Sequence, residues 1–132
     1  MKQLFTGKNF GLTIVFLWFM LGGIAHFTNP EFFVAIMPPY VPWHLEIVYL
    51  SGVFEILGAL GILLPATRQL AGNCLILLVI CVSPANIYMW MNPELFPDVS
   101  EVFLSVRLLV QVMLLWLIWW CTRTAAPGAR ER

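Results

Sequence analysis

Four long apolar segments constrain the fold of this chain more than any other feature of its sequence. They cover residues 10–27, 47–64, 70–90 and 102–121, and each is close to the ~20 residues that a helix needs to cross the hydrocarbon core of a bilayer. Inside lipid every backbone amide needs a partner within the protein, so only helices or closed barrels can span it. Because the segments lack the period-2 alternation of barrel strands, the sequence predicts an all-α protein, an antiparallel bundle of four transmembrane helices.

The composition supports a membrane location and a single domain. Hydrophobic residues make up 61% of the 132 residues and charged residues 11%, with a mean hydropathy of +0.87. A soluble domain of this length could not bury so much apolar surface. We assign residues 1–122 to one membrane domain and residues 123–132 to a basic tail. The net charge is zero and there is no basic cluster, so we expect no nucleic-acid partner.

The positive charges predict the orientation of the helices. The connections 28–46 and 92–101 contain no Lys or Arg, whereas the third connection and both ends of the chain do. Cytoplasmic segments are enriched in these residues, so we expect both termini in the cytoplasm and these two connections outside. The residues that carry this pattern are Lys2, Lys8, Arg68, Arg123, Arg130 and Arg132. The first segment also has features of a secretory signal, but we interpret it as a retained helix.

The first connection is the only sizeable stretch outside the four segments. Asn29-Pro30-Glu31 is typical of a helix start, with proline in the first turn, and Pro38, Pro39 and Pro42 prevent a helix from continuing. The sequence therefore predicts a short helix in the outer membrane interface that could cap the bundle. The alternative is an ordinary interfacial connector.

Five polar side chains interrupt the apolar segments, and all of them fall in the outer half of the predicted bundle. At a rise of ~1.5 Å per residue, Glu55 lies about 12 Å below the outer surface, Arg107 about 8 Å and Gln111 about 13 Å. Asn86 lies about 5 Å from that surface, and His26 ends the first helix. An isolated charge at a helix centre costs about 2.5–3.5 kcal/mol on insertion scales. We therefore predict that Glu55 and Arg107 pair, directly or through Gln111 or Asn86.

Two interpretations of this polar group remain open. It could be a buried network that fixes the register of the helices, or it could line a ligand pocket that opens to the outside or to the outer leaflet. The inner half of the predicted bundle has no ionisable side chain apart from thiols. A device that only fixes register needs no such asymmetry, so the pattern favours a ligand site formed by His26, Glu55, Asn86, Arg107 and Gln111.

The remaining metal-binding and redox-active residue types form no recognisable site. The spacing of His26 and His44 matches no known ligand signature, so we predict no metal site. Cys74 and Cys81 are about 10 Å apart along one helix, too far for a disulfide. We expect these two cysteines and Cys121 to be small apolar packing residues.

In combination, several motifs resemble the DoxX family of small four-helix membrane proteins. These are "GGIAHF", "NPEFF", "SGVFEILGALGILLPATR", "SPANIYM" and "RLLVQ". The resemblance implies a four-helix bundle in the bacterial inner membrane. Family members are linked to redox systems, including a thiosulfate:quinone oxidoreductase, and a related animal branch assists receptor assembly. The family's recurrent polar positions correspond to the five polar residues above. The paired cysteines of thiol-redox relatives are absent, which argues against dithiol exchange.

Three functions compete at this point. The first is a ligand-binding accessory subunit of a membrane redox system, with a quinone as the candidate cofactor and a membrane or periplasmic redox partner. The second is an assembly or stability factor for a membrane partner, with a structural polar group. The third, a small-solute transporter, is disfavoured because four helices are few for alternating access, unless the protein forms homo-oligomers. The sequence contains no nucleophile with a base and no phosphate loop, so we do not expect an enzyme that acts alone.

Overall fold

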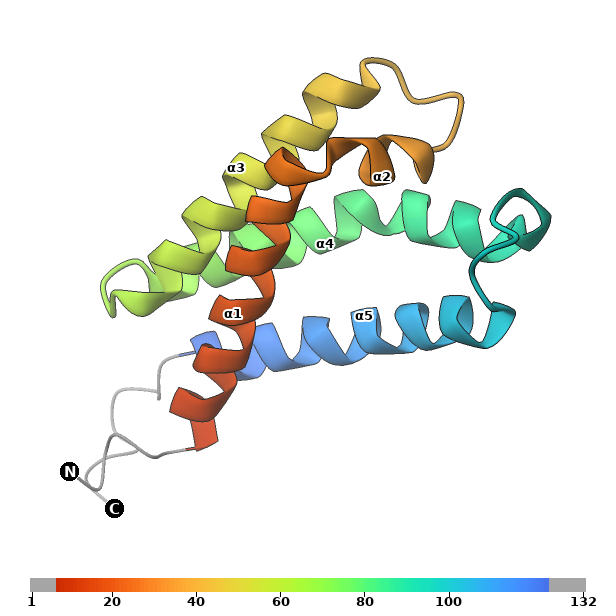
Figure 1. Ribbon diagram of the computed structural model, residues 1–132. Helices are drawn as coiled ribbons and strands as arrows, with labels where there is room; N and C mark the ends of the chain where they lie inside the picture. The colour runs from red at the N-terminus through yellow and green to blue at the C-terminus, as the bar shows by residue number, and fades with distance from the viewer. Residues whose placement is uncertain (1–6, 124–132) are drawn as a thin grey trace, which may run out of the picture.

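The computed structural model describes residues 7–123, and this part of the chain is helical and contains no strand (Figure 1). The four long helices are α1 (Gly7–Thr28), α3 (His44–Leu63), α4 (Arg68–Met91) and α5 (Glu101–Thr122). The short helix α2 (Pro30–Ala35) and the 3-10 turn η2 (Pro93–Leu95) lie in the connections. All four long helices are long and apolar enough to cross a membrane. The prediction of an all-α protein with four candidate membrane spans is confirmed, while Lys2 and residues 124–132 of the predicted tail lie outside the described residues.

The four long helices form a ring. Helix α1 packs on α3, α3 on α4, α4 on α5, and α5 closes the ring on α1. Figure 1 shows α4 and α5 running side by side, with α1 crossing in front of them and diverging from α5 along its length. In this ring α3 and α5 stand diagonally opposite each other, so the side chains that face inward from these two helices face each other across the centre.

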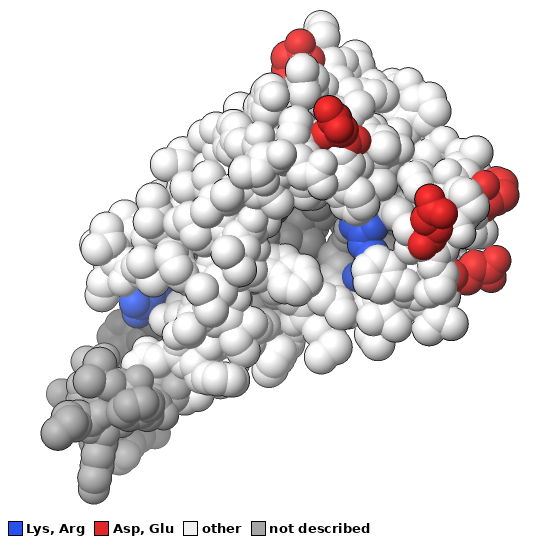
Figure 2. Space-filling view, in the orientation of Figure 1, with Lys and Arg blue, Asp and Glu red and all other residues white. Residues whose placement is uncertain are grey.

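Charged side chains define two ends of the molecule. The acidic end carries Glu31, Glu46, Glu94, Asp98 and Glu101, and the basic end carries Lys8, Arg68 and Arg123. Figure 2 shows the acidic residues of this face gathered at one end and a basic patch at the other. Of the charged residues that the structure describes, only Glu55 and Arg107 lie between the two ends, within the long helices.

Local sequence explains where several helices begin and end. Pro30 occupies the first turn of α2, where its missing N–H leaves no hydrogen bond unmade. Ser100 caps α5, because its Oγ accepts a hydrogen bond from the Phe103 amide at 3.1 Å. At the other end of the molecule, Arg68 Nε donates to the carbonyl of Ile62 at 2.8 Å and so satisfies a C-terminal carbonyl of α3.

Two glycines allow the backbones of α1 and α3 to approach closely. A Cβ added to Gly23 would lie 3.0 Å from the carbonyl oxygen of Gly52 and 2.7 Å from a side-chain carbon of Ile56. A Cβ added to Gly52 would lie 2.8 Å from the Cβ of His26. Small residues of this kind let transmembrane helices pack tightly when lipid supplies no hydrophobic drive. The contact also brings the last turn of α1, with His26, against the middle of α3, with Glu55.

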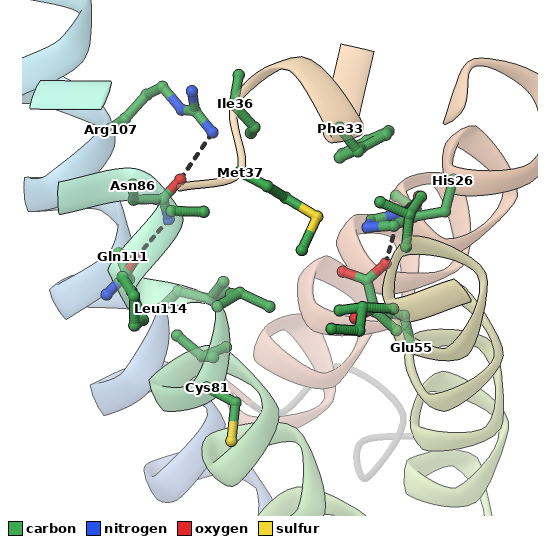
Figure 3. Close-up of a pocket in the computed structure, with 18 of the residues that line it drawn as sticks. His26, Phe33, Ile36, Met37, Glu55, Cys81, Asn86, Arg107, Gln111 and Leu114 are labelled. Atoms are coloured by element: carbon green, nitrogen blue, oxygen red, sulfur yellow. Dashed lines mark hydrogen bonds and ion pairs between the residues drawn. The ribbon is translucent and has the colours of Figure 1, made fainter. Parts of the chain in front are cut away.

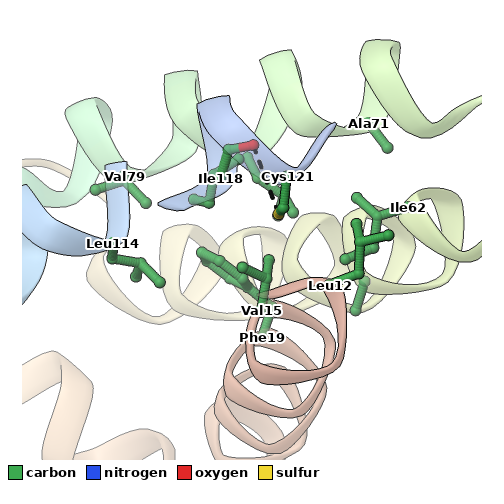
Figure 4. Close-up of a cluster of buried hydrophobic side chains, with 11 residues drawn as sticks. Leu12, Val15, Phe19, Ile62, Ala71, Val79, Leu114, Ile118 and Cys121 are labelled. Carbon is green, nitrogen blue, oxygen red and sulfur yellow. Dashed lines mark hydrogen bonds between the residues drawn. The ribbon is translucent and has the colours of Figure 1, made fainter. Parts of the chain in front are cut away.

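The buried apolar core lies toward the basic end of the helices, and Figure 4 shows its side chains packed between them. It takes side chains from all four long helices, including Val15, Ile62, Leu75 and Ile118, each at most 1% exposed. The complete cluster is Leu12, Val15, Phe19, Ala59, Ile62, Ala71, Leu75, Val79, Leu114, Ile118 and Cys121. The polar group described below has no member in this cluster.

The prediction that all three cysteines pack in the interior is wrong for two of them. Cys121 is buried in the core, but Cys74 and Cys81 of α4 are exposed, and Cys81 lines the cavity described below. All three are free thiols, as the spacing along the helix predicted for Cys74 and Cys81. An apolar helix in lipid can be apolar all round, so composition alone does not tell which of its small residues face inward.

The segment 36–43, which we call the strap, follows α2 and runs back to the start of α3. Ile36 is buried against Met89 of α4 and Leu104 of α5, so the strap is fastened to the opposite side of the ring. A ring nitrogen of His44 lies 3.2 Å from the carbonyl oxygen of Pro38. Trp43 bends the chain into α3 with φ 52°, the one positive φ of a non-glycine residue within 7–123. The strap therefore covers the acidic end of the bundle.

Candidate ligand cavity

A cavity of about 840 Å³ lies between the α1–α3 pair and the α4–α5 pair, on the acidic side of the core. Its floor is formed by the core residues Phe19, Val79 and Leu114, and its roof by α2 and the strap. All five predicted site residues, namely His26, Glu55, Asn86, Arg107 and Gln111, line it. The volume is in the range of known small-molecule sites, roughly 300–1,000 Å³. His44, in contrast, does not line this cavity.

The polar residues stand on two walls that face each other (Figure 3). One wall, formed by α1 and α3, holds His26 and Glu55. The other, formed by α4 and α5, holds Asn86, Arg107 and Gln111. Figure 3 shows apolar side chains between the two walls, with Met37 above the gap and Leu114 below it.

The first wall is an imidazole–carboxylate pair. His26 Nδ1 lies 3.0 Å from Glu55 Oε2 and 2.7 Å from the carbonyl oxygen of Gly22, one turn earlier in α1. Both neighbours are acceptors, so Nδ1 carries the proton. Its hydrogen bond is made to the Gly22 carbonyl, and Glu55 Oε2 lies at ion-pair distance. Phe33 of α2 stacks on the imidazole with a centroid distance of 3.8 Å. This arrangement fixes the ring and leaves its other nitrogen, Nε2, without a hydrogen-bond partner in the described structure.

Glu55 is poorly satisfied by the protein. Its Oε2 is buried and, within residues 7–123, has no well-directed hydrogen bond, although it lies at ion-pair distance from His26. The side chain is 16% exposed. A buried acceptor without a good donor costs about 1–3 kcal/mol, so this carboxylate has unused capacity for a ligand donor.

The second wall is a continuous chain of hydrogen bonds. Arg107 Nη2 donates to Asn86 Oδ1 at 2.9 Å, and Asn86 Nδ2 donates to Gln111 Oε1 at 2.5 Å. Gln111 Nε2 donates to Ser83 Oγ at 2.5 Å, and that hydroxyl donates to the carbonyl of Val79 at 2.8 Å. Each amide uses its oxygen and its nitrogen, which fixes its orientation. The chain ties α4 to α5 and holds the Arg107 guanidinium beside the cavity.

The charge of Arg107 has no counter-ion in the described part of the chain. Its guanidinium contacts Asn86 Oδ1 and, through Nη1, the sulfur of Met89 at 2.8 Å, both of which are neutral. No carboxylate of residues 7–123 lies within ion-pairing distance. A guanidinium has five N–H groups, and two of them are used here. The remaining donors and the positive charge are available to a ligand.

The predicted pairing of Glu55 with Arg107 is therefore wrong. Glu55 pairs with His26, and the chain through Asn86 and Gln111 does not reach the carboxylate. The two charges have similar depth, but they sit on α3 and α5, which are diagonal in the ring and separated by the cavity. The cost of each charge is reduced within its own helix pair.

Several residues that shape the site were not assigned to it from the sequence. Ser83 ends the hydrogen-bond chain behind the second wall. Of the lining residues, Phe33 stacks on His26, and Met37 and Val41 belong to the roof. The sequence does contain a signal for Ser83. It lies about one helical turn before Asn86, so both side chains are on the same face of the helix. The contacts of Phe33 and of the strap depend on how the first connection folds back, for which the sequence offers no periodic signal.

The fold and the cavity define a class: a multi-pass helical membrane protein with a polar cavity on one side of a closed core. Residues 15–124 match the family described as "Domain of unknown function (DUF8561)", and the chain belongs to this family. The matched region includes all five predicted site residues. No curated protein and no solved structure matches the chain.

Proposed function

We propose that this protein binds a small amphipathic ligand in the cavity, as an accessory subunit of a membrane redox system. The observation that carries the proposal is the uncompensated guanidinium of Arg107 at the wall of an 840 Å³ cavity. A cation within a membrane span is costly and is normally paired or functional. A ligand oxygen would supply the acceptor that the protein does not.

The distribution of charge supports an orientation for the bundle. The basic end would face the cytoplasm and the acidic end the outside, because basic residues are retained on the cytoplasmic side. The cavity then lies in the outer half of the membrane, and α2 lies at the outer interface. The resemblance to the DoxX family supports the inner membrane of a bacterium as the location.

A quinone is the ligand that suits these walls best. One carbonyl oxygen of the ring would accept from a free N–H of Arg107, with Asn86 beside it, and the other side of the ring would face His26 and Glu55. Glu55 could exchange a proton with the reduced form. The isoprenoid tail would lie along the apolar surfaces of α1 and α3. The link to redox chemistry comes from the DoxX resemblance, which also suggests a membrane or periplasmic redox partner.

The proposal is tested by mass spectrometry of lipid-soluble molecules extracted from the purified full-length protein. The wild type is compared with Glu55→Gln and Arg107→Ala, and Arg68→Ala at the basic end serves as the control for the loss of a cation. A stoichiometric quinone or other amphiphile, absent from both cavity variants and retained in the control, is the expected result. A wild type that carries no such molecule overturns the proposal.

A second function is favoured by one observation, the completeness of the hydrogen-bond chain between α4 and α5. Such a chain stabilises a bundle whether or not a ligand binds. The protein would then be an assembly or stability factor for a membrane partner. Co-purification of that partner with both the wild type and Glu55→Gln, with no bound amphiphile in either, is the result that favours this function.

A further inference from the structure

The first and last helices of the bundle touch at the basic end and separate toward the acidic end. A Cβ added to Gly11 of α1 would lie 3.2 Å from both Cys121 and Leu117 of α5, so the two helices are in close contact there. Farther along, Trp18 and Leu21 of α1 line the cavity, as do side chains of α5. Figure 1 shows the two helices diverging in this direction.

The divergence leaves an opening in the side of the bundle. Figure 2 shows a hollow on the face where α1 crosses in front of α4 and α5, with a basic side chain at its edge. Of the basic residues that the structure describes, Arg107 is the one that lines the cavity. The opening therefore leads into the cavity whose wall carries the unpaired Arg107 guanidinium.

The rim of this opening is apolar and faces away from the core. Leu21 is 64% exposed and Trp18 is 52% exposed on α1, while Phe103 is 53% and Val106 is 46% exposed on α5. All four residues lie within candidate membrane spans. In a membrane these side chains would contact the lipid chains, where a rim of large apolar side chains is favourable and an open polar backbone would not be.

The end of the bundle that faces water is covered. Pro38 of the strap is buried, Ile36 is fastened between α4 and α5, and Met37 and Val41 close the cavity from above. A water-soluble molecule would have to displace the strap, whereas a molecule dissolved in the bilayer meets an opening at the level of the cavity.

We propose that the gap between α1 and α5 is a lateral portal through which the ligand enters from the lipid. The inference rests on the proposed function and narrows its ligand to an amphipath that partitions into the bilayer. Its head carries an acceptor oxygen for Arg107, and its tail remains at the rim beside Leu21 and Val106. A free polar solute from the aqueous phase does not fit this entry route.

The portal can be tested without knowing the ligand. The full chain in phosphatidylcholine vesicles is photolabelled with a lipid-soluble aryl diazirine or with free photo-leucine, a water-soluble diazirine, and the labelled residues are mapped by mass spectrometry. We expect the lipid-soluble reagent to label Val79 and Leu114 on the cavity floor, although these residues are only 4% and 8% exposed. Free photo-leucine should not label them.

A blocked portal supplies the control. Val106→Trp and, on the opposite rim, Leu21→Trp should each reduce lipid-soluble labelling of the floor severalfold. Val112→Trp, at an outward-facing position of α5 that does not line the cavity, should leave it unchanged. Any of three results would overturn the portal. The floor could be labelled by photo-leucine, it could be labelled by neither reagent, or its labelling by the lipid-soluble reagent could be unchanged in both rim variants.

The outcome separates the portal from the proposed function. If only the lipid-soluble reagent labels the floor and no amphiphile co-purifies, the portal is supported and the ligand-binding proposal is refuted. A co-purified amphiphile together with floor labelling by photo-leucine supports ligand binding and overturns entry from the lipid.

Discussion

The core at the basic end and the cavity at the acidic end are built by the same four helices, yet they are held together differently. In the core, side chains such as Val15 and Ile118 meet partners from the facing helices and leave no exposed surface. Around the cavity, the polar contacts stay within each helix pair: His26 lies against Glu55, and Arg107 donates to Asn86. The core thus joins four helices into one body, while the cavity separates two pairs.

The largest loss of stability is expected from a substitution in the fully packed core. Ile118→Ala should lower the free energy of unfolding by about 2–4 kcal/mol, because it removes a fully buried side chain and leaves a void. Ile47→Ala makes the same chemical change at a half-buried residue of the cavity wall, where part of the side chain already borders empty space. It should cost less than about 1 kcal/mol. Unfolding in mixed micelles, followed by circular dichroism, measures both values, and equal losses would refute the contrast between the two regions.

The close approach of α1 and α3 offers a test on two adjacent glycines. Gly23→Ala should cost about 1–3 kcal/mol, because the new methyl group meets the Gly52 carbonyl and Ile56 and pushes the helices apart. Gly22→Ala adds the same methyl group 3.7 Å from Glu55 Oε1, an ordinary contact. It should be neutral or stabilise the helix by up to about 1 kcal/mol.

Thermal unfolding of the two variants in the same detergent decides this comparison. If Gly23→Ala were as stable as Gly22→Ala, the contact that places His26 against Glu55 would not be as tight as the structure shows.

Double-mutant cycles should reproduce the separation of the two walls. The cycle between Glu55→Gln and Arg107→Gln should give a coupling energy below about 0.5 kcal/mol, because these residues share no partner. The cycle between Arg107→Gln and Asn86→Ala should give about 1 kcal/mol or more, because one donates directly to the other. A strong Glu55–Arg107 coupling would mean that the charges meet across the cavity, as the sequence suggested.

The sequence predicts how deep in the bundle each site residue lies. The rise of a helix is fixed, so positions along the four segments predict that His26, Glu55, Asn86, Arg107 and Gln111 lie in the same half of the bundle, and all five line one cavity. The partner of each residue could not be derived in the same way. It depends on the order and rotation of the helices in the ring, which are set by local contacts such as Gly23 against Gly52.

The ends of the helices show a similar limit. The apolar segments predicted the existence and number of the long helices, but α3 begins at His44 and α4 at Arg68, before the predicted segments 47–64 and 70–90 start. Polar residues extend a helix beyond the hydrocarbon core wherever capping or side-chain hydrogen bonds permit. The strap is the least predictable element, because its course depends on the contact of Ile36 with Met89 and Leu104 rather than on any periodic pattern.

The smallest effect should come from the far end of the hydrogen-bond chain. Ser83→Ala removes the acceptor of Gln111 Nε2 and should cost about 1 kcal/mol. Ser105→Ala removes an exposed acceptor of the Trp90 indole on the same helix pair, 3.2 Å away, and should change stability by less than about 0.5 kcal/mol. Thermal unfolding measures both.

The same pair of variants also distinguishes the two proposed functions. If the chain positions Arg107 for a ligand, the amount of amphiphile that co-purifies should fall in Ser83→Ala and remain unchanged in Ser105→Ala, because Gln111 and Asn86 lose their fixed orientation only in the former. If the hydrogen-bond chain is purely structural, Ser83→Ala should be less stable than the wild type while the membrane partner still co-purifies. A Ser83→Ala variant that keeps both its stability and its ligand would show that the second wall does not depend on this hydrogen-bond chain. The rigidity of that wall would then have to come from packing alone.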